Sequence, residues 1–334
     1  MGHTLKGSAA FAAEKSHRDI AYEVMTLVDI CVDMILTGNV RPRFHQVEQM
    51  VGDLSLQLGG SSSIFAAQIA KLGTRTAALG WLGADAFGDF ALSELDKTGV
   101  DVSRVKRHAT MRTGVGVALS EPEDRAILTY MGTLDAPNSS DLDPSLLGLI
   151  AHWHIGAYFL LRGLQPHWPE WLRLCRTAGI TTSLDPNWDP NECWTGIIEI
   201  LPFIDVFLPN EAEALAISRQ INIQDAARSL SQYGPLVVIK CGERGAIAAR
   251  GNKLWELDAS KSTVVPAHIA DTTGAGDNFD AGFLHGWLAE WDVNPCLELG
   301  HRCAVSSLEH PGGIHGQLVI PAGAVGCSGK ARLK

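Results

Sequence analysis

The sequence has few charged residues and no excess of positive charge. Asp, Glu, Lys and Arg make up 19% of the 334 residues, and 37 acidic residues outnumber 27 basic ones, which gives a formal net charge of −10. Nucleic acids and anionic membranes are bound through clustered positive charge. We therefore expect neither as a partner, and any anionic ligand must be held by a local site.

Patterns of paired cysteines and long hydrophobic runs are also missing. The seven cysteines include no CxxC pair and no histidine at a zinc-binding spacing, so we expect free thiols in a reducing cytoplasm. No apolar run reaches the roughly 18 residues that a membrane helix needs, and the N-terminus has no basic segment followed by an apolar one. These observations predict a cytoplasmic protein with no membrane partner.

Two common nucleotide-binding motifs are absent. No GxxxxGK[ST] occurs, which argues against a P-loop kinase. No GxGxxG follows the first strand-like run, which argues against a dinucleotide-binding oxidoreductase. His152 and His154 alternate along an expected strand without acidic or cysteine partners at metal spacing, so we interpret them as core residues.

The residues that are present predict one α/β domain over residues 24–320. Residues 1–23 are interpreted as an N-terminal extension and residues 321–334 as a C-terminal tail. The apolar run from Val24 to Leu36 predicts a strand buried on both faces of a parallel sheet. Strand-like and helical segments alternate from residue 150, which predicts a doubly wound, mainly parallel sheet with helices on both faces.

A second, smaller β layer is expected beside this sheet. The segments TGVGVALS and RAILTYMG, separated by EPED, have the alternation of a hairpin. This hairpin, within residues near 105–132, and a second segment near residues 37–58 are predicted to form a β-sheet lid. Such a lid would close over a substrate and exclude water.

The sharpest chemical motif is ADTTGAGDNFDAGFLHGWL, residues 270–288. Three small residues, Gly274, Ala275 and Gly276, precede a helical pattern, so a helix begins at a glycine turn. Its unpaired N–H groups and dipole favour an anion such as a transferring phosphoryl group. Asp277 is then the candidate base for a substrate hydroxyl. The alternative is an ordinary glycine loop whose aspartate complements the helix dipole.

This motif resembles the second signature of the ribokinase (PfkB-like) carbohydrate kinases, DTTGAGDxFxAGF, and the likeness extends from about Val24 to Val319. The resemblance implies phosphoryl transfer from ATP to a hydroxyl of a small sugar-like substrate. Gly274, Ala275 and Gly276 would form the anion hole, with Asp277 as the base. ATP, Mg²⁺ and, in some relatives, K⁺ are the implied cofactors.

The resemblance also implies which residues bind the substrate. Asp33 matches the acidic residue that binds substrate hydroxyls, and Gly59-Gly60 match the first signature, beside Ser61. The family's asparagine five residues after the first glycine is replaced by Ile64, which cannot hydrogen-bond a sugar. Arg41 and Arg43, in the expected first lid strand, and Arg162 suggest an acidic or phosphorylated sugar as substrate; the alternative is that they are solvated surface arginines.

Residues implied on the nucleotide side are spread along the chain. Those expected at ATP or its phosphates are Asp185, Asn187, Asn210, Lys240, Gly242, Gly245 and Thr272. Glu213, in PNEAEA, is expected to hold Mg²⁺ through water, although a capped helix start explains this motif equally well. Asp271 and Thr273 lie where related enzymes bind potassium.

Two other functions remain open from the sequence alone. The protein could be a catalytically weak sugar-binding or regulatory homologue, which the change at Ile64 would permit, or a nucleoside kinase of the same fold. Related kinases dimerise through the lid, and the edges of an exposed β layer favour the same homodimer here.

Overall fold

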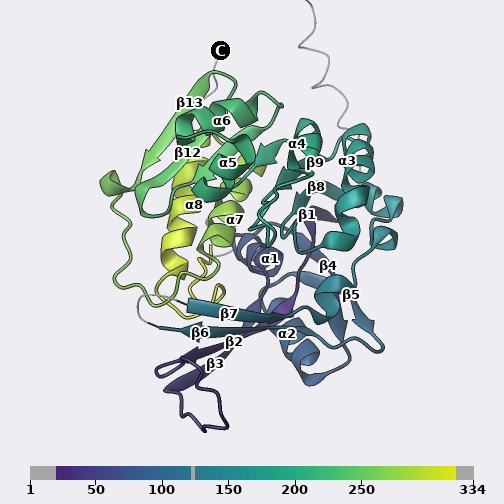
Figure 1. Cartoon of the computed structure of the whole chain (residues 1–334). Helices are drawn as coiled ribbons and strands as arrows, with labels where there is room; N and C mark the ends of the chain where they lie inside the picture. The colour runs from purple at the N-terminus through teal and green to yellow at the C-terminus, as the bar shows by residue number, and fades with distance from the viewer. Residues whose placement is uncertain (1–19, 122–124, 321–334) are drawn as a thin grey trace, which may run out of the picture.

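A computed structural model describes residues 20–121 and 125–320 of the chain (Figure 1). Its centre is a nine-stranded sheet in the order β13-β12-β11-β10-β9-β8-β1-β4-β5, in which every pair is parallel except β11–β12 and β12–β13. The strands are β1 (Tyr22–Leu27), β4 (Thr76–Gly83), β5 (Asp101–His108), β8 (Ile150–Ile155), β9 (Thr181–Leu184), β10 (Val206–Phe207), β11 (Leu236–Lys240), β12 (Gly245–Arg250) and β13 (Lys253–Asp258). The predicted mainly parallel sheet is confirmed.

Helices cover both faces of this sheet, as expected for a doubly wound fold. They are α1 (Ser61–Lys71), α2 (Ala86–Asp96), α3 (Trp168–Thr177), α4 (Ile197–Ile200), α5 (Glu211–Ser218), α6 (Ile223–Ser231), α7 (Ala275–Leu288) and α8 (Val293–Ser307). Alternate residues of β11 face opposite cores: Val237 and Ile239 pack with α3, α5 and α6, whereas Leu236 and Val238 pack with α7 and α8. This two-sided burial explains the nearly continuous apolar runs in the sequence.

The lid is a separate four-stranded sheet in the order β3-β2-β6-β7, below the main body in Figure 1. Its strands are β2 (Cys31–Thr37), β3 (Asp53–Gly59), β6 (Gly114–Ser120) and β7 (Arg125–Tyr130). The antiparallel pairing of β6 with β7 confirms the expected hairpin. The small β-sheet lid is therefore present.

Three expectations about this region are wrong in detail. Residues 24–36 form two strands in different sheets, because the chain leaves β1 at Leu27 and enters the lid at Cys31. The lid therefore includes β2, whereas residues 105–108 belong to β5 of the main sheet. Both strands are apolar, so the hydrophobic pattern could not show the break. Arg41 and Arg43 lie in the loop between β2 and β3, not in a strand.

The outer bounds also differ slightly from expectation. The first strand begins at Tyr22, inside the segment interpreted as an extension, while residues 1–19 and the expected tail at 321–334 lie outside the described residues. The six cysteines in the described ranges are free thiols. No helix in those ranges has the length and apolar character to cross a membrane.

The packing of α7 against α8 depends on a glycine. A Cβ at Gly282 would lie 2.8 Å from the Leu299 carbonyl oxygen and 2.8 Å from the Cys303 sulfur. Such contacts are closer than van der Waals packing allows, so a methyl group there must push the helices apart. Gly282 thus lets α8 approach the helix that begins at the predicted site.

We predict that Gly282→Ala lowers the free energy of unfolding by about 1–2 kcal/mol, because overpacking exceeds the gain in helix propensity. Urea denaturation followed by circular dichroism measures the change. Gly148→Ala is the matched control, since a Cβ at Gly148 meets nothing within 4 Å. Equal stability of the two variants would contradict the packing argument.

Candidate active site

The predicted anion hole lies at the start of α7. This helix start is next to Lys240, the last residue of β11, at the carboxyl ends of the parallel strands. Gly274 is the N-cap residue in the left-handed region, with φ of 73°. A Cβ at Gly274 would lie 2.9 Å from Gly313 Cα and 2.9 Å from Ile64 Cδ1. Both the backbone angle and the space require glycine here.

Backbone donors at this helix start are available to a ligand. Asn278 N–H donates to the Gly274 carbonyl at 2.9 Å, and Ala275 N–H to the Thr272 carbonyl at 3.3 Å. For the N–H groups of Gly276 and Asp277, no acceptor is present among the residues that the structure describes. The first N–H groups of a helix have no partner within it and carry its positive dipole end. The arrangement suits an anion.

Asp277 lies in this first turn and is 9% exposed. Burial raises its pKa well above the ordinary value, and the Asp185 and Asp29 charges raise it further, whereas Lys240 and the Ser61 hydroxyl lower it. A carboxylate with a raised pKa is a good proton acceptor once ionised. Its position and electrostatics fit the predicted base.

The start of α1 lies next to the start of α7, since the Ser61 hydroxyl contacts Asp277. Its N-cap Gly60 has φ of 96°, and a Cβ there would lie 2.1 Å from the Asp29 carbonyl oxygen. The Asp29 carboxylate accepts the N–H of Ser61 at 3.1 Å and of Ser62 at 2.8 Å. Asp29 therefore caps α1 and fixes the predicted Gly59-Gly60 turn. The sequence interpretation missed this role, although Asp29 interrupted the apolar run.

Asn187 connects the loop after β9 to α1. Its side-chain N–H donates to Ser61 Oγ at 2.8 Å, and its Oδ1 accepts the Ala157 N–H at 2.5 Å. Asn187 has φ of 56°, a conformation that asparagine tolerates better than most residues. The structure thus brings the predicted residues Asn187, Ser61 and Asp277 together, with the amide of Asn187 engaged in positioning.

Lys240 lies between two buried carboxylates. Its ammonium binds Asp185 at 2.9 Å and Asp280 at 2.8 Å. Burial lowers the pKa of Lys240, but the charges of Asp185, Asp280 and Glu213 raise it by more, so it stays protonated. A Cβ at Gly276 would lie 3.6 Å from this ammonium. Lys240 therefore places positive charge beside the anion hole, and Asp280, one turn after Asp277, is a participant that we did not predict.

The Asn210–Glu213 motif starts α5. Asn210 donates its N–H to Glu213 Oε2 at 2.8 Å and its side-chain N–H to Oε1 at 2.7 Å, while Glu213 N–H donates to Asn210 Oδ1 at 2.9 Å. The capped helix start, which was the alternative interpretation of this motif, is thus present, and Mg²⁺ binding by Glu213 stays a prediction. Burial, followed by the charge of Asp185, raises the pKa of Glu213 to about 7.

The donor set at this edge fits hydrated Mg²⁺. The carboxylates of Glu213 and Asp185 supply hard oxygens, and the charges of both act on Lys240. No cluster of three His, Cys, Asp or Glu that could enclose a metal occurs in the part of the chain that the structure describes. Mg²⁺ keeps several waters and shares its coordination with substrate phosphates, so it needs no such cluster.

Asp33 projects from the central lid strand β2. A Cβ at Gly59 would lie 2.5 Å from its carboxylate, and one at Gly116 would lie 2.6 Å from its Oδ1. The two glycines flank Asp33 on adjacent lid strands and leave space for its side chain. The predicted substrate residues Asp33 and Gly59 are therefore neighbours.

The predicted potassium residues form a closed turn before α7. Asp271 accepts hydrogen bonds from the N–H of Thr273 at 2.9 Å, its hydroxyl at 2.8 Å and the Gly312 N–H at 2.9 Å. Thr272 between them is exposed, and its carbonyl caps the helix start. These contacts hold the loop in place, and potassium binding stays a prediction.

The remaining predicted residues lie at the borders of the site. Gly242 and Gly245 form the turn between β11 and β12, and a Cβ at Gly245 would lie 2.0 Å from the Leu257 carbonyl oxygen. Arg162 begins a short 3₁₀ helix and binds Asp135 at 2.9 Å in an exposed ion pair. Its contact with substrate stays a prediction.

Ile64 does not replace the family's asparagine as a polar contact. Its side chain is buried, and Cβ atoms at Gly313 and Gly274 would meet it at 2.6 Å and 2.9 Å. The neighbouring Ser62 and Ser63 are also buried, so Ser61 is the half-buried serine of this group. A polar ligand contact here depends on Ser61.

The two histidines lie in the core below α1. His152 hydrogen-bonds Thr181 and Ser183, His154 bonds the same Ser183 hydroxyl at 2.8 Å, and His154 stacks on Phe65. Burial lowers the pKa of each histidine to about 3. Both are neutral residues committed to packing and hydrogen bonds.

Comparisons with known proteins agree with this geometry. The chain is 29% identical over 252 residues to a protein of Archaeoglobus fulgidus described as an uncharacterized sugar kinase, covering 74% of this chain and 97% of the relative. It is 26% identical over 258 residues to fructoselysine 6-kinase of Escherichia coli, covering 76% and 90%. The fold matches a ribokinase II of Escherichia coli, solved with ATP and Mg²⁺, with a TM-score of 0.78, 21% identity and coverage of 89% and 96%.

The family comparison covers most of the chain. The description pfkB family carbohydrate kinase matches residues 25–319, which include the lid, both glycine turns and α7. The resemblance seen in the sequence is thus confirmed, as is the ribokinase-like fold. The chain belongs to the pfkB family of carbohydrate kinases and is an enzyme that phosphorylates a hydroxyl group.

Proposed function

We propose that the protein transfers the γ-phosphoryl group of ATP to a hydroxyl of a small sugar-like molecule, with Asp277 as the general base. The observation that carries this proposal is the start of α7, where the N–H groups of Gly276 and Asp277 have no acceptor among the described residues. These donors and the Asp277 carboxylate share one helical turn. A base and an anion site so close together suit in-line phosphoryl transfer.

The substrate hydroxyl would approach Asp277 from the lid side. Asp33 and the Gly59-Gly60 turn would hold the other hydroxyls, and Asn187 would keep Ser61 in place through its 2.8 Å hydrogen bond. As the oxygen attacks, Asp277 accepts its proton, while the Gly274–Gly276 segment stabilises charge on the phosphoryl oxygens. Glu213 would hold Mg²⁺ through water, and the ion, when bound, offsets the charge of the ATP phosphates.

The charge around the site favours a substrate without an acidic group. Arg41 binds Glu121 and Arg162 binds Asp135, both in exposed ion pairs. Lys240 is already bound to two carboxylates. The substrate side itself carries Asp33 and Asp29, which repel an anion. A neutral sugar, polyol or amine-bearing sugar fits better.

A nucleoside kinase is the second candidate. A cytidine kinase of Thermococcus kodakarensis is 39% identical over 103 residues, although this covers 30% of the chain. A catalytically weak sugar-binding homologue is less well supported, because Asp277, the anion hole and Lys240 are all present. Sugar-dependent ADP release separates these alternatives.

We predict that ADP release from Mg-ATP is stimulated by at least one member of a panel of neutral sugars, polyols, amine-bearing sugars, sugar acids, sugar phosphates and nucleosides. Asp277→Asn should lower kcat by about 10²–10⁴-fold, because it removes proton transfer. Its affinity for Mg-ATP, measured by calorimetry, should change little. A variant that retains full turnover would reject Asp277 as the base.

The raised pKa of Asp277 gives a prediction about stability. Because the folded state holds this proton more tightly than the unfolded state, the wild type loses stability as pH rises from about 4 to the raised pKa. Asparagine has no such cost. Urea unfolding at pH 5 and pH 8 should therefore show Asp277→Asn to be more stable than wild type, with the larger difference at pH 8. A difference in the free energy of unfolding between variant and wild type that is smaller at pH 8 than at pH 5 would contradict a raised pKa of Asp277.

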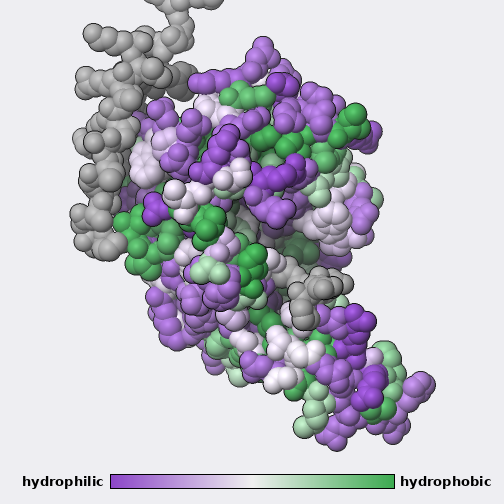
Figure 2. Space-filling model, turned by 90° about the vertical axis from the view of Figure 1, so that its left-hand side faces the viewer, coloured by the Kyte–Doolittle hydropathy of each residue, from purple (hydrophilic) through white to green (hydrophobic). Residues whose placement is uncertain are grey.

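We also propose a homodimer formed through the lid. Several apolar side chains on its strands are exposed, including Leu54 at 53%, Leu128 at 62% and Tyr130 at 55%. Figure 2 shows hydrophobic side chains scattered among hydrophilic ones on the projecting lower part of the molecule. Apolar area of this kind on a sheet with open edges favours association.

Leu128→Glu should convert the dimer to a monomer, because it places a charge in the apolar contact. Analytical ultracentrifugation measures the mass. Ile221→Glu is the control, since Ile221 is 94% exposed and lies between α5 and α6, away from the lid. A wild-type monomer at all concentrations would refute the dimer and leave the proposed reaction unaffected.

A further inference from the structure

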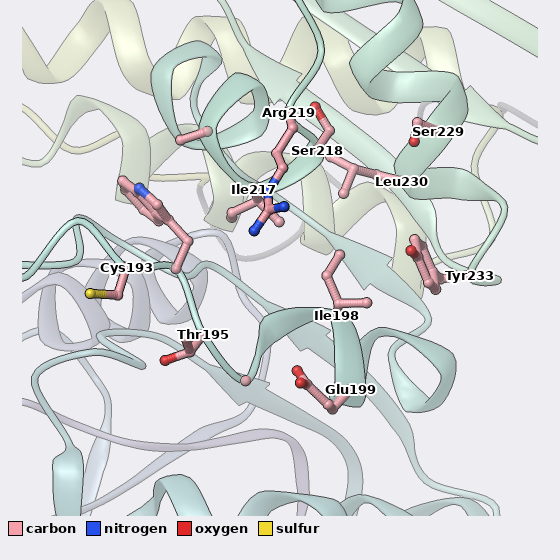
Figure 3. A pocket seen from close by; sticks show the side chains of 13 residues that line it. Cys193, Thr195, Ile198, Glu199, Ile217, Ser218, Arg219, Ser229, Leu230 and Tyr233 are labelled. Carbon is pink, nitrogen blue, oxygen red and sulfur yellow. The ribbon is translucent and has the colours of Figure 1, made fainter.

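A second cleft lies outside the catalytic constellation, between α4, the end of α5 and α6 (Figure 3). Its volume is about 370 Å³, at the lower end of the range for small-molecule sites. None of its lining residues contributes to the α7 turn, the α1 turn or the lid. It adjoins the core of the sheet face covered by α3, α5 and α6, since Ile217 and Leu230 belong to both.

The cleft contains one charge of each sign. Figure 3 shows the Arg219 guanidinium in the middle of the opening and the Glu199 carboxylate below it. The structure records no ion pair between them, so their charged atoms lie more than 4.0 Å apart. No hydrogen bond of either side chain occurs among the described residues, although the charge of Glu199, after burial, helps raise the pKa of Tyr158 to about 12. Both charges are exposed to solvent, and a ligand that carries a carboxylate and an ammonium at matching separation can bind both at once.

The rest of the lining limits the ligand further. Ile198, Ile217 and Leu230 present apolar surface, and hydroxyls come from Thr195, Ser218, Ser229 and Tyr233. A nucleotide carries several negative charges for one arginine and would be repelled by Glu199. A neutral sugar would leave both charges unpaired. An α-amino acid with an apolar side chain matches the two charges, the apolar wall and the small volume.

One wall of the cleft is continuous with the active site. Cys193 and Trp194, which line the cleft, donate their N–H groups to the buried Asp189 carboxylate at 2.8 Å each. The same loop begins with Asp185 and Asn187, which bind Lys240 and Ser61 respectively. The wall of the cleft at Trp194 and the two groups beside the anion hole therefore belong to one loop, nine positions apart at most.

We propose that this cleft binds an apolar α-amino acid as a regulatory ligand, with its carboxylate on Arg219 and its ammonium on Glu199, and that its occupancy alters Mg-ATP affinity. Linkage makes the effect reciprocal, so Mg-ATP must change the affinity for the amino acid by the same factor. The binding site does not depend on the proposed reaction, whereas the coupling rests on the proposed ATP site.

The direct test is calorimetric titration of the whole protein with L-leucine. We expect binding by wild type, and a loss of affinity of roughly 10-fold to 100-fold in Arg219→Gln and in Glu199→Gln, because each removes a charge-assisted hydrogen bond. Arg173→Gln and Glu298→Gln change exposed charges outside the cleft and should bind as wild type. No heat with L-leucine, or equal affinity in all four variants, overturns the site.

Two leucine analogues test the two charges separately. 4-Methylpentanoate lacks the ammonium group and 3-methylbutylamine lacks the carboxylate, and we expect each to bind at least about tenfold more weakly than L-leucine. An equal affinity for 4-methylpentanoate would mean that the cleft is an anion site and would overturn the role of Glu199. Unchanged thermal melting of the variants excludes unfolding as the cause of lost binding.

The coupling is tested by titrating Mg-ATP with and without saturating L-leucine. The Kd for Mg-ATP should shift at least about twofold in wild type and not in Arg219→Gln. Leucine binding with an unchanged Kd for Mg-ATP would refute the coupling and retain the site. Absence of Mg-ATP binding under both conditions would instead contradict the proposed kinase function, with the leucine result still standing.

Discussion

The structure of the site depends on the balance of negative charge at one edge of the main sheet. Asp185, Asp280 and Glu213 all act on the ammonium of Lys240, and Asp277 lies beside them. Buried carboxylates are stable only when cations or N–H groups compensate them. Lys240 and the starts of α1 and α7 supply this compensation, so the groups that stabilise the buried carboxylates are the same groups that we propose to bind phosphate.

Close approach of the backbone is the second constraint. Gly60 passes so near the Asp29 carbonyl that a Cβ would lie 2.1 Å away, and a Cβ at Gly274 would lie 2.9 Å from both Gly313 and Ile64. Both are N-cap residues with positive φ. Two helices can therefore begin within reach of the same ligand. Ile64, which seemed to be a lost substrate contact, instead fills the space between these two turns.

Much of this was predictable, because short motifs determine local geometry. The GAGD turn, the paired glycines and the alternating strands and helices predicted the α7 site and the doubly wound sheet. The Asn210–Glu213 capping box was anticipated only as an alternative. Long-range contacts were not predictable: the Asp280–Lys240 ion pair joins residues 40 positions apart, and no local pattern indicates it. The break between β1 and β2 was hidden because both strands are apolar.

That break is also what connects the lid to the catalytic turn. Three residues separate β1 from β2, and Asp29 lies among them, with its carboxylate on the N–H groups of α1. Asp33 follows four residues later on the lid. A substrate that binds Asp33 therefore acts on a short segment whose other end holds Ser61, which in turn hydrogen-bonds Asn187 and contacts Asp277. One short stretch of backbone thus joins the lid sheet to the start of α1 and, through Ser61, to Asp277.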